Sequence, residues 1–206
     1  MDAAALHRSE HQQFLDRYYG WSRSIYDVTR KYYLFGRDQA VAQLLEEPWR
    51  RLVEVGPGTG RNLKLLHAQR PEALFGGVEA STAMLEVARS ACPWAVLTEG
   101  FAEDAEYRDL LGAPPDRILF SYCLSMVQDP EGALAHARSQ LAPGGEIVVV
   151  DFGGLGGLRG PAAPALRRWL EAFHVTPLPR GLLESHARSI LEGPLGYYRI
   201  ARISRP

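Results

Sequence analysis

The residues best suited to ligand chemistry form a glycine-rich turn. Gly56, Gly58 and Gly60 occupy every second position after the apolar run 52–55, and a helical pattern follows them. Glycine has no Cβ, so a turn of this composition can be tight and a ligand can approach its backbone closely. The spacing differs from that of dinucleotide-binding and phosphate-binding loops, and the turn contains no Lys. It therefore predicts a nucleotide-type site at which no phosphate is expected.

Two acidic residues accompany this turn. Glu79 follows a second strand-like run, 73–78, about twenty residues further on, where an acid can accept hydrogen bonds from both hydroxyls of a ribose. Glu54 lies inside the first apolar run, directly before the turn, and is placed to hold a ligand's ammonium group. The two acids predict a ligand that carries both a ribose and an amino group.

Alternating and helical patterns place these residues within a longer series of strands and helices. The glycine-rich stretch 153–160 has the composition of a lid or a long connection. Ser81 is expected to cap the helix that follows Glu79. Strands are expected at 52–55, 73–78, 95–98, 117–123, 146–151 and 197–203, and helices at 37–47, 81–89, 131–141, 164–173 and 182–191.

The turn, the two acids and the Leu-x-Pro-Gly-Gly string at 141–145 resemble motifs of the class I S-adenosylmethionine-dependent methyltransferases. The resemblance runs from about Tyr26 to the last residue. It implies an α/β fold, a doubly wound and mostly parallel seven-stranded sheet of the Rossmann-like kind. It also implies S-adenosylmethionine as co-substrate, bound by Glu54, Glu79 and the three glycines.

The resemblance also implies which further residues line the cofactor site. In many members of the class an Asp at the position of Phe101 binds the adenine amino group, whereas Phe is present here. We therefore expect Phe101 to pack on the ring and a backbone carbonyl to accept from the amine, and Ala102 is also among the expected cofactor-binding residues. Ser121 and Tyr122 should face the reactive centre, because ligands bind at the carboxyl ends of parallel strands. Arg37 completes the expected cofactor-binding residues.

The chain before the first strand is expected to be a helical cap, residues 1–50, on a core formed by residues 51–206. Tyr19, Tyr26 and Tyr33 repeat every seven residues on the flank of a helical apolar stripe. Tyr rings attract a cation such as a sulfonium, so they are candidates to roof the pocket. Tyr26 would then lie at the reacting atoms, and the other two at the cofactor. The alternative is that these rings only pack on the sheet.

Four strings resemble one branch of the class, the bacterial diacylglyceryl-homoserine N-methyltransferases of betaine-lipid synthesis. The resemblance covers nearly the whole chain and implies transfer of methyl groups to the amine of a homoserine-type headgroup. The four strings are 26–38, 120–126, 150–153 and 173–177.

The azetidine synthases of peptide natural-product pathways are similar to this branch as well. In their reaction the α-amine of S-adenosylmethionine displaces the sulfonium at Cγ, methylthioadenosine is released, and no second substrate enters. The chain departs from the lipid-methyltransferase pattern at 127–130 and in the loop 153–160. Methyl transfer to a small-molecule or lipid-headgroup amine is the first choice, and self-cyclisation stays open. A non-catalytic binding module is disfavoured because the ribose acid and the whole turn are present.

In both reactions a nitrogen lone pair attacks a carbon bound to positive sulfur, so most of the catalysis should come from positioning. The amine must be neutral, and a water-poor aromatic pocket lowers its pKa by desolvation. Tyr122, Asp151 and His174 are candidate general bases. Each also has a structural interpretation: packing for Tyr122, capping of the next turn for Asp151 and a satisfied strand-end histidine for His174.

Composition narrows the class of partner. The chain has 206 residues, 46% of them hydrophobic, and its net charge of −1 gives no general attraction to nucleic acid. Two Cys and six His show no ligand spacing, so no metal is expected. No apolar run is long enough to span a bilayer and the first residues are polar, so we expect a cytoplasmic enzyme with at most peripheral membrane contact. The sequence leaves the oligomeric state open.

Overall fold

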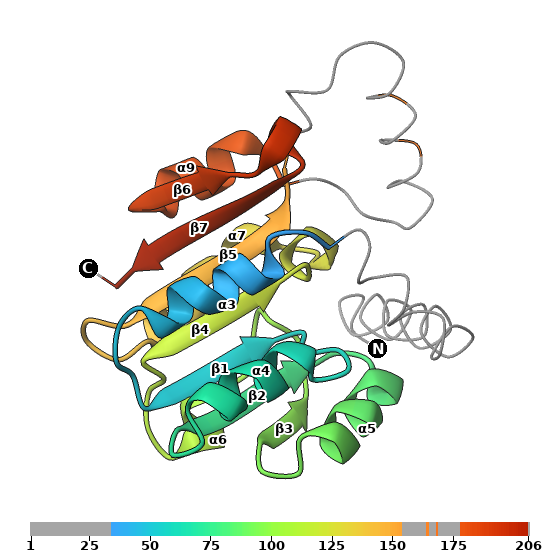
Figure 1. Cartoon of the computed structure of the whole chain (residues 1–206), viewed down its shortest axis with the longest axis vertical. Helices are drawn as coiled ribbons and strands as arrows, with labels where there is room; N and C mark the ends of the chain where they lie inside the picture. The colour runs from blue at the N-terminus through green and yellow to red at the C-terminus, as the bar shows by residue number, and fades with distance from the viewer. Residues whose placement is uncertain (1–33, 154–163, 165–167, 169–177, 206) are drawn as a thin grey trace, which may run out of the picture.

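The structure, a computed structural model, describes residues 34–153, 164, 168 and 178–205. Within these ranges a seven-stranded sheet has the order β3-β2-β1-β4-β5-β7-β6, with β1 to β5 parallel and β7 antiparallel to β5 (Figure 1). The expected doubly wound, mostly parallel sheet is confirmed. The strands are β1 Arg51–Val55, β2 Leu74–Glu79, β3 Val96–Glu99, β4 Arg117–Ser121, β5 Glu146–Phe152, β6 Ser189–Glu192 and β7 Tyr198–Ser204.

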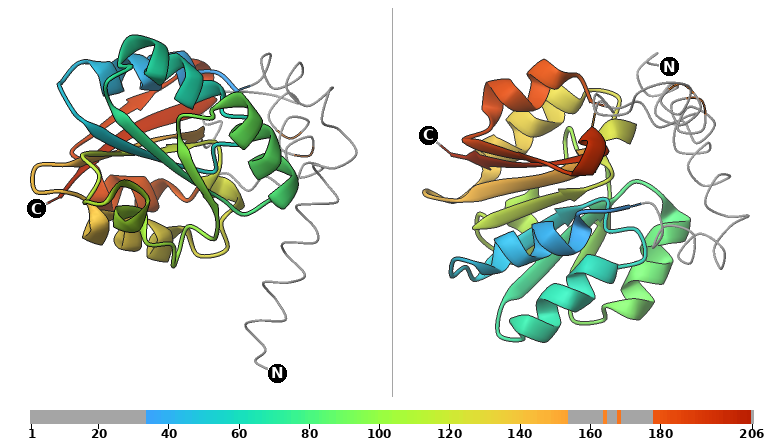
Figure 2. Two further views of the ribbon diagram at one scale, coloured as in Figure 1. Left: turned by 90° about the horizontal axis from the view of Figure 1, so that it is seen from below. Right: turned by 45° about the horizontal axis from the view of Figure 1, so that its top comes forward.

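Two layers of helices cover the sheet, one on each face (Figure 2). Buried side chains of α3, α4 and α5 belong to one core cluster, and those of α6, α7 and α9 to the other. The helices are α3 Arg37–Leu45, α4 Arg61–Gln69, α5 Thr82–Ala91, α6 Tyr107–Leu111, α7 Pro130–Gln140 and α9 Arg180–His186, with 3-10 turns η1 Leu124–Met126 and η2 Pro194–Gly196.

The strands supply both clusters by alternation, because successive side chains of a strand point to opposite faces. Leu52 packs into the α3–α4–α5 cluster, whereas Val53 and Val55 pack into the other. Every residue of β5 is buried, as expected of a central strand with both faces covered. The same alternation turns Glu54 toward the face covered by α3 and α4.

The order of the strands determines where a ligand can bind. From β1 the sheet grows through β2 and β3 on one side and through β4 and β5 on the other. Such a reversal of strand order leaves a crevice outside the carboxyl ends of the central strands, where ligands of doubly wound sheets bind. The glycine turn leaves β1 at this point.

Two expected elements differ in the structure. The helix expected at 182–191 is two elements: α9 ends at His186, and β6 pairs antiparallel with β7. Pairing with the neighbouring strand overrides the helical pattern there. The fourth strand was expected to reach Cys123 but ends at Ser121, because Tyr122 has φ 55° and leaves the extended conformation. The closing strand is confirmed as β7, and Ser81 caps α5 as expected.

The remaining sequence predictions concern residues outside the described ranges. Most of the expected cap, residues 1–50, lies there, as do most of the loop 153–160 and of the helix 164–173. The division between cap and core at residue 50 therefore stays a prediction. In the described part of the chain, no helix is long and apolar enough to cross a membrane.

Candidate active site

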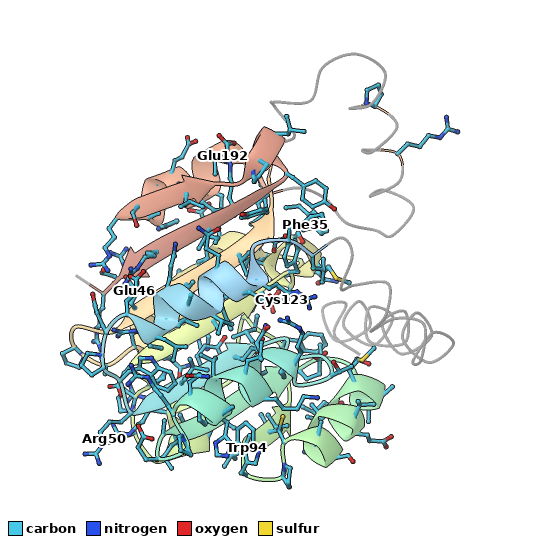
Figure 3. The ribbon with its side chains drawn as sticks, in the orientation of Figure 1. Phe35, Glu46, Arg50, Trp94, Cys123 and Glu192 are labelled. Atoms are coloured by element: carbon cyan, nitrogen blue, oxygen red, sulfur yellow. The ribbon has the colours of Figure 1, made fainter. Side chains whose placement is uncertain are left out.

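A cavity of about 290 Å³ opens at the carboxyl ends of the strands, beside the glycine turn. Its walls come from the turn, the end of β2, the start of α5, the segment after β3 and the segment after β4. In Figure 3, Cys123 from this cavity and Phe35 lie toward one end of the sheet, and Glu46 and Arg50 toward the other. The lining residues are Val55, Gly56, Gly58, Val78, Glu79, Ala80, Met84, Gly100, Phe101, Ala102, Glu103, Tyr122, Cys123, Met126, Val127, Gln128 and Asp129.

The glycine turn requires its three glycines. Gly56, Gly58 and Gly60 have φ values of 67°, 58° and 77°, in the left-handed region that other residues rarely adopt. A Cβ on Gly56 would lie 2.7 Å from the Cβ of Cys123, so the first glycine also permits close packing of the loop after β4. Gly60 is the N-cap of α4. Gly56 and Gly58 line the cavity, as expected, whereas Gly60 is not among the lining residues.

Glu79 lies at the end of β2, lines the cavity and is 7% exposed. Its Oε2 accepts from the amide N–H of Gly58 at 2.9 Å, and its Oε1 accepts from that of Ser81 at 3.0 Å. The carboxylate thus ties the glycine turn to the start of α5. A carboxylate oxygen can accept more than one hydrogen bond, so both oxygens can still accept from a ribose.

Glu54 is almost completely buried, with 1% exposure, and is not among the cavity-lining residues. Its Oε1 accepts from the side-chain amide of Asn62 at 2.7 Å, whereas its Oε2 has no hydrogen-bond partner among the described residues. Asn62, in the first turn of α4, was not among the predicted site residues. Eight residues separate it from Glu54, and only the strand–turn–helix geometry brings the two together.

Burial without a full set of partners raises the pKa of Glu54 from 4.5 to about 8. Nearby Glu79 raises it further, while the Asn62 hydrogen bond and the charges of Arg37 and Arg61 lower it. The ligand-free site therefore holds a proton on this carboxyl at neutral pH. An ammonium group beside Oε2 would favour the ionised form instead.

Ligand-free protein is expected to lose stability as the pH rises from about 4.5 to about 8. Over this window the unfolded chain releases the Glu54 proton and the folded protein retains it. Folding is therefore weakened by up to about 1.4 kcal/mol per pH unit. Glu54→Gln still offers Asn62 an acceptor but cannot ionise. The free energy of unfolding of this variant, measured by urea denaturation, should therefore fall less steeply between pH 4.5 and 8 than that of the wild-type protein. If the free energy of unfolding depended equally on pH in the wild-type protein and in Glu54→Gln, the raised pKa of Glu54 would be contradicted.

Phe101 and Ala102 both line the cavity, next to Glu103. The carbonyl of Phe101 accepts from the amide N–H groups of Asp104 at 3.4 Å and Ala105 at 3.2 Å. The carbonyl of Ala102 accepts from the hydroxyl of Tyr107 at 2.9 Å, and the Tyr107 ring is fully buried. The Ala102 carbonyl therefore ties this segment to α6.

Tyr122 lines the cavity, as expected, whereas Ser121 does not. The Tyr122 hydroxyl donates to the backbone carbonyl of Phe35, and the ring packs edge-on against Phe152 with centroids 4.7 Å apart. Burial raises the pKa of Tyr122 well above its ordinary value. The side chain thus joins the end of β4 to the segment that enters α3.

Asp151, near the end of β5, is fully buried and is not among the cavity-lining residues. Its Oδ2 accepts from the amide N–H of Ser125 at 3.0 Å and its Oδ1 from that of Phe152 at 2.8 Å. Burial raises its pKa to about 6, although these hydrogen bonds lower it. The carboxyl holds the start of η1, and through it the loop that carries Met126.

Arg37 begins α3 but is not among the cavity-lining residues; its Nε donates to the carbonyl of Leu34 at 3.2 Å. It lies near enough to Glu54 to lower the pKa of that carboxyl. The other predicted site residues, Tyr19, Tyr26, Tyr33 and His174, lie outside the described residues, and their roles stay predictions.

The loop after β4 supplies five lining residues that were not among the predicted site residues. Cys123, Met126, Val127, Gln128 and Asp129 form this wall. The thiol of Cys123 donates to the carbonyl of Val55 at 2.9 Å, which ties the loop to the end of β1. The sequence signals at this loop were the string 120–126, which resembles the lipid-methyltransferase branch, and the departure from that pattern at 127–130. Across residues 34–153 and 178–205, no three His, Cys, Asp or Glu side chains gather as metal ligands.

Comparison with known families identifies the domain. Residues 26–185 match the family model described as a methyltransferase domain. The chain belongs to this family. The match covers β1 to β5, the glycine turn and Glu79, so the whole cavity lies inside the methyltransferase domain.

The curated relatives that match this chain include two different methyltransferases. The demethylmenaquinone methyltransferase of Tropheryma whipplei (strain Twist) is 34% identical over 107 residues, 49% of this chain and 41% of the relative. The trans-aconitate 2-methyltransferase of Paracidovorax citrulli is 31% identical over 98 residues, 48% of this chain and 37% of the relative. The chain thus spans less than half the length of either curated relative.

The solved structures share the fold. A SAM-dependent methyltransferase from Thermotoga maritima superposes with a TM-score of 0.66 over 92% of this chain and 99% of the other, at 19% identity. The class I methyltransferase fold expected from the motifs is therefore confirmed.

Proposed function

We propose that the protein is an S-adenosylmethionine-dependent N-methyltransferase that acts on the amine of a small, amino-acid-like acceptor, free or as a lipid headgroup of the homoserine type. The observation that carries the proposal is Glu79 in the cavity wall, bound to the glycine turn at the reversal of strand order. This is where a doubly wound sheet holds a ribose. The amino-acid end of the co-substrate would bind toward Glu54, whose Oε2 has no hydrogen-bond partner among the described residues, although this carboxyl is buried and does not line the cavity in the ligand-free protein.

The charge of the cavity wall supports an amine acceptor. Glu79, Glu103 and Asp129 line it, and no Lys, Arg or His stands among its described lining residues. The negative field of these acids acts on any acceptor in the same cavity, even where the acids themselves face the co-substrate or cap a helix. An acceptor with several carboxylates, such as the trans-aconitate in the name of one relative, would be repelled there. An amine can enter as a cation, and desolvation then favours its neutral, nucleophilic form.

The described side chains support catalysis by positioning rather than by a dedicated base. The Tyr122 hydroxyl donates to a backbone carbonyl, and Asp151 is fully buried and is not among the cavity-lining residues. S-Adenosylmethionine would supply an electrophilic methyl group on positive sulfur. The chain would hold its ribose at Glu79 and exclude water with Met84, Met126 and Val127, so that an amine is aligned for in-line attack.

The self-cyclisation alternative needs the α-amine of S-adenosylmethionine to be neutral. An ammonium next to Glu54 would stay protonated, because a buried carboxylate beside it favours the charged amine. This arrangement supports methyl transfer to a second substrate.

An acceptor panel tests the amine assignment. Purified protein with S-adenosylmethionine should release S-adenosylhomocysteine when homoserine-type amines are added, at a rate at least tenfold above the rate without acceptor. Trans-aconitate and demethylmenaquinone serve as the contrasting acceptors. Turnover with either of these, together with none on the amines, would contradict the amine assignment.

A further inference from the structure

The wall after β3 lies where the purine of the co-substrate would bind, if the proposed function is right. Glu79 places the ribose at the end of β2, and the glycine turn at the end of β1 takes the amino-acid side. Since β3 lies beyond β2 in the sheet, the base extends toward residues 100–103, which line the cavity. Adenine differs from other purines by its exocyclic amine, which requires a hydrogen-bond acceptor in this wall.

Two backbone carbonyls and one carboxylate of the cavity wall already accept hydrogen bonds within the protein. The Phe101 carbonyl accepts from two backbone amides and the Ala102 carbonyl from the Tyr107 hydroxyl. Across the cavity, the Asp129 carboxylate accepts from the amide N–H of Gly132 at 2.9 Å and caps α7. The two carbonyls are therefore partly or fully used within the protein, and the backbone carbonyl expected from the sequence to accept from the amine stays a prediction.

Glu103 is the exception. It is half-buried and lines the cavity, and among the described residues the hydrogen bond that its Oε1 accepts is a long one, 3.5 Å, from the amide N–H of Asp129. Its carboxylate thus lies where the segment after β3 meets the loop before α7. An ionised carboxylate has about four acceptor sites, so the Asp129 contact leaves most of its capacity unused.

We propose that Glu103 is the residue that recognises the exocyclic amine of the adenine ring and so selects adenosine over nucleosides that carry an oxygen at the same position. The carboxylate accepts a hydrogen bond from the amine. A 6-oxo purine would instead point an oxygen at the carboxylate, and two acceptors facing each other repel and stay unpaired. The acidic function lost at Phe101 is thereby supplied two residues later.

If Glu103 had only a structural role, its removal would have a different effect on nucleoside affinity. If the side chain only linked the two loops through Asp129, its removal would weaken all nucleosides equally. Recognition of the amine requires that the ratio of affinities changes. Glu103→Gln is informative because its amide can donate to an oxo group while keeping the size of the side chain.

Calorimetric titration of the ligand-free protein with S-adenosylhomocysteine and S-inosylhomocysteine tests the proposal. The wild-type protein should bind S-adenosylhomocysteine at least tenfold more tightly than S-inosylhomocysteine. Glu103→Ala should lose most of this difference in affinity. Glu103→Gln should reduce the difference mainly because it binds S-inosylhomocysteine more tightly. Asp104→Asn, at the exposed neighbouring acid, should leave the ratio unchanged.

An unchanged ratio in both Glu103 variants would overturn the proposal and leave the methyltransferase function standing. Binding of neither ligand to the wild-type protein would overturn the proposed function, and the role of Glu103 with it.

Discussion

Replacing Glu79 with Ala should weaken the binding of S-adenosylhomocysteine by about 3 kcal/mol, or about 150-fold, as measured by calorimetry. Two hydrogen bonds from ribose hydroxyls to a carboxylate would be lost, each worth about 1.5 kcal/mol or more. The change also releases the amides of Gly58 and Ser81, which Glu79 holds in the ligand-free protein. The turn would then have to be ordered by the ligand itself.

Glu99 provides a matched control for this experiment. It is the register partner of Glu79 on the neighbouring strand β3, but it is exposed and is not among the cavity-lining residues. Glu99→Ala should bind the ligand as wild type does. If Glu79→Ala bound it equally well, Glu79 would not be the ribose acceptor, and the main support for the proposed function would be gone.

Replacing Gly60 with Val should lower the free energy of unfolding by about 3 kcal/mol, measured by urea denaturation. Gly60 has φ 77°, which costs a residue with a Cβ about 1–2 kcal/mol. The new Cβ would also lie 2.6 Å from the Sγ of Cys92, so the packing between α4 and α5 must shift, at about 1–3 kcal/mol.

Two further variants separate these contributions. Gly112 also has a left-handed φ, 67°, but a Cβ there meets nothing within 4 Å, so Gly112→Val should show the backbone cost alone. Adding Cys92→Ala to Gly60→Val removes the sulfur, and the double variant should lose less stability than the sum of the single variants. Additive losses would show that the contact with Cys92 does not matter.

The residues whose position in the cavity wall the sequence predicted are those whose placement follows from local geometry. A strand followed by alternating glycines fixes the turn, and an acid at the tip of the next strand must lie beside it, because parallel neighbours end at the same edge. Gly56, Gly58 and Glu79 therefore meet in the cavity as expected. The same logic of alternation and spacing was enough to predict the central strands.

The features that sequence missed depend on contacts between distant segments. No sequence pattern indicates that Asn62 donates to one oxygen of Glu54 while the other oxygen has no partner among the described residues. Nor does any pattern indicate that Asp151 accepts from the amide N–H of Ser125. The left-handed conformation of Tyr122 is also a product of tertiary packing, since an aromatic residue rarely adopts it. These contacts decide which polar groups remain available for chemistry, and only the three-dimensional arrangement shows them.

The fate of the methyl group tests the proposed function most directly. The protein is incubated with S-adenosylmethionine deuterated in its methyl group, with and without a homoserine-type amine, and the products are identified by mass spectrometry. Methyl transfer predicts S-adenosylhomocysteine without deuterium and an acceptor that carries the deuterated methyl group, with almost no turnover when the acceptor is omitted. Methylthioadenosine that retains the deuterium, formed at an enzyme-like rate without any acceptor, would contradict methyl transfer.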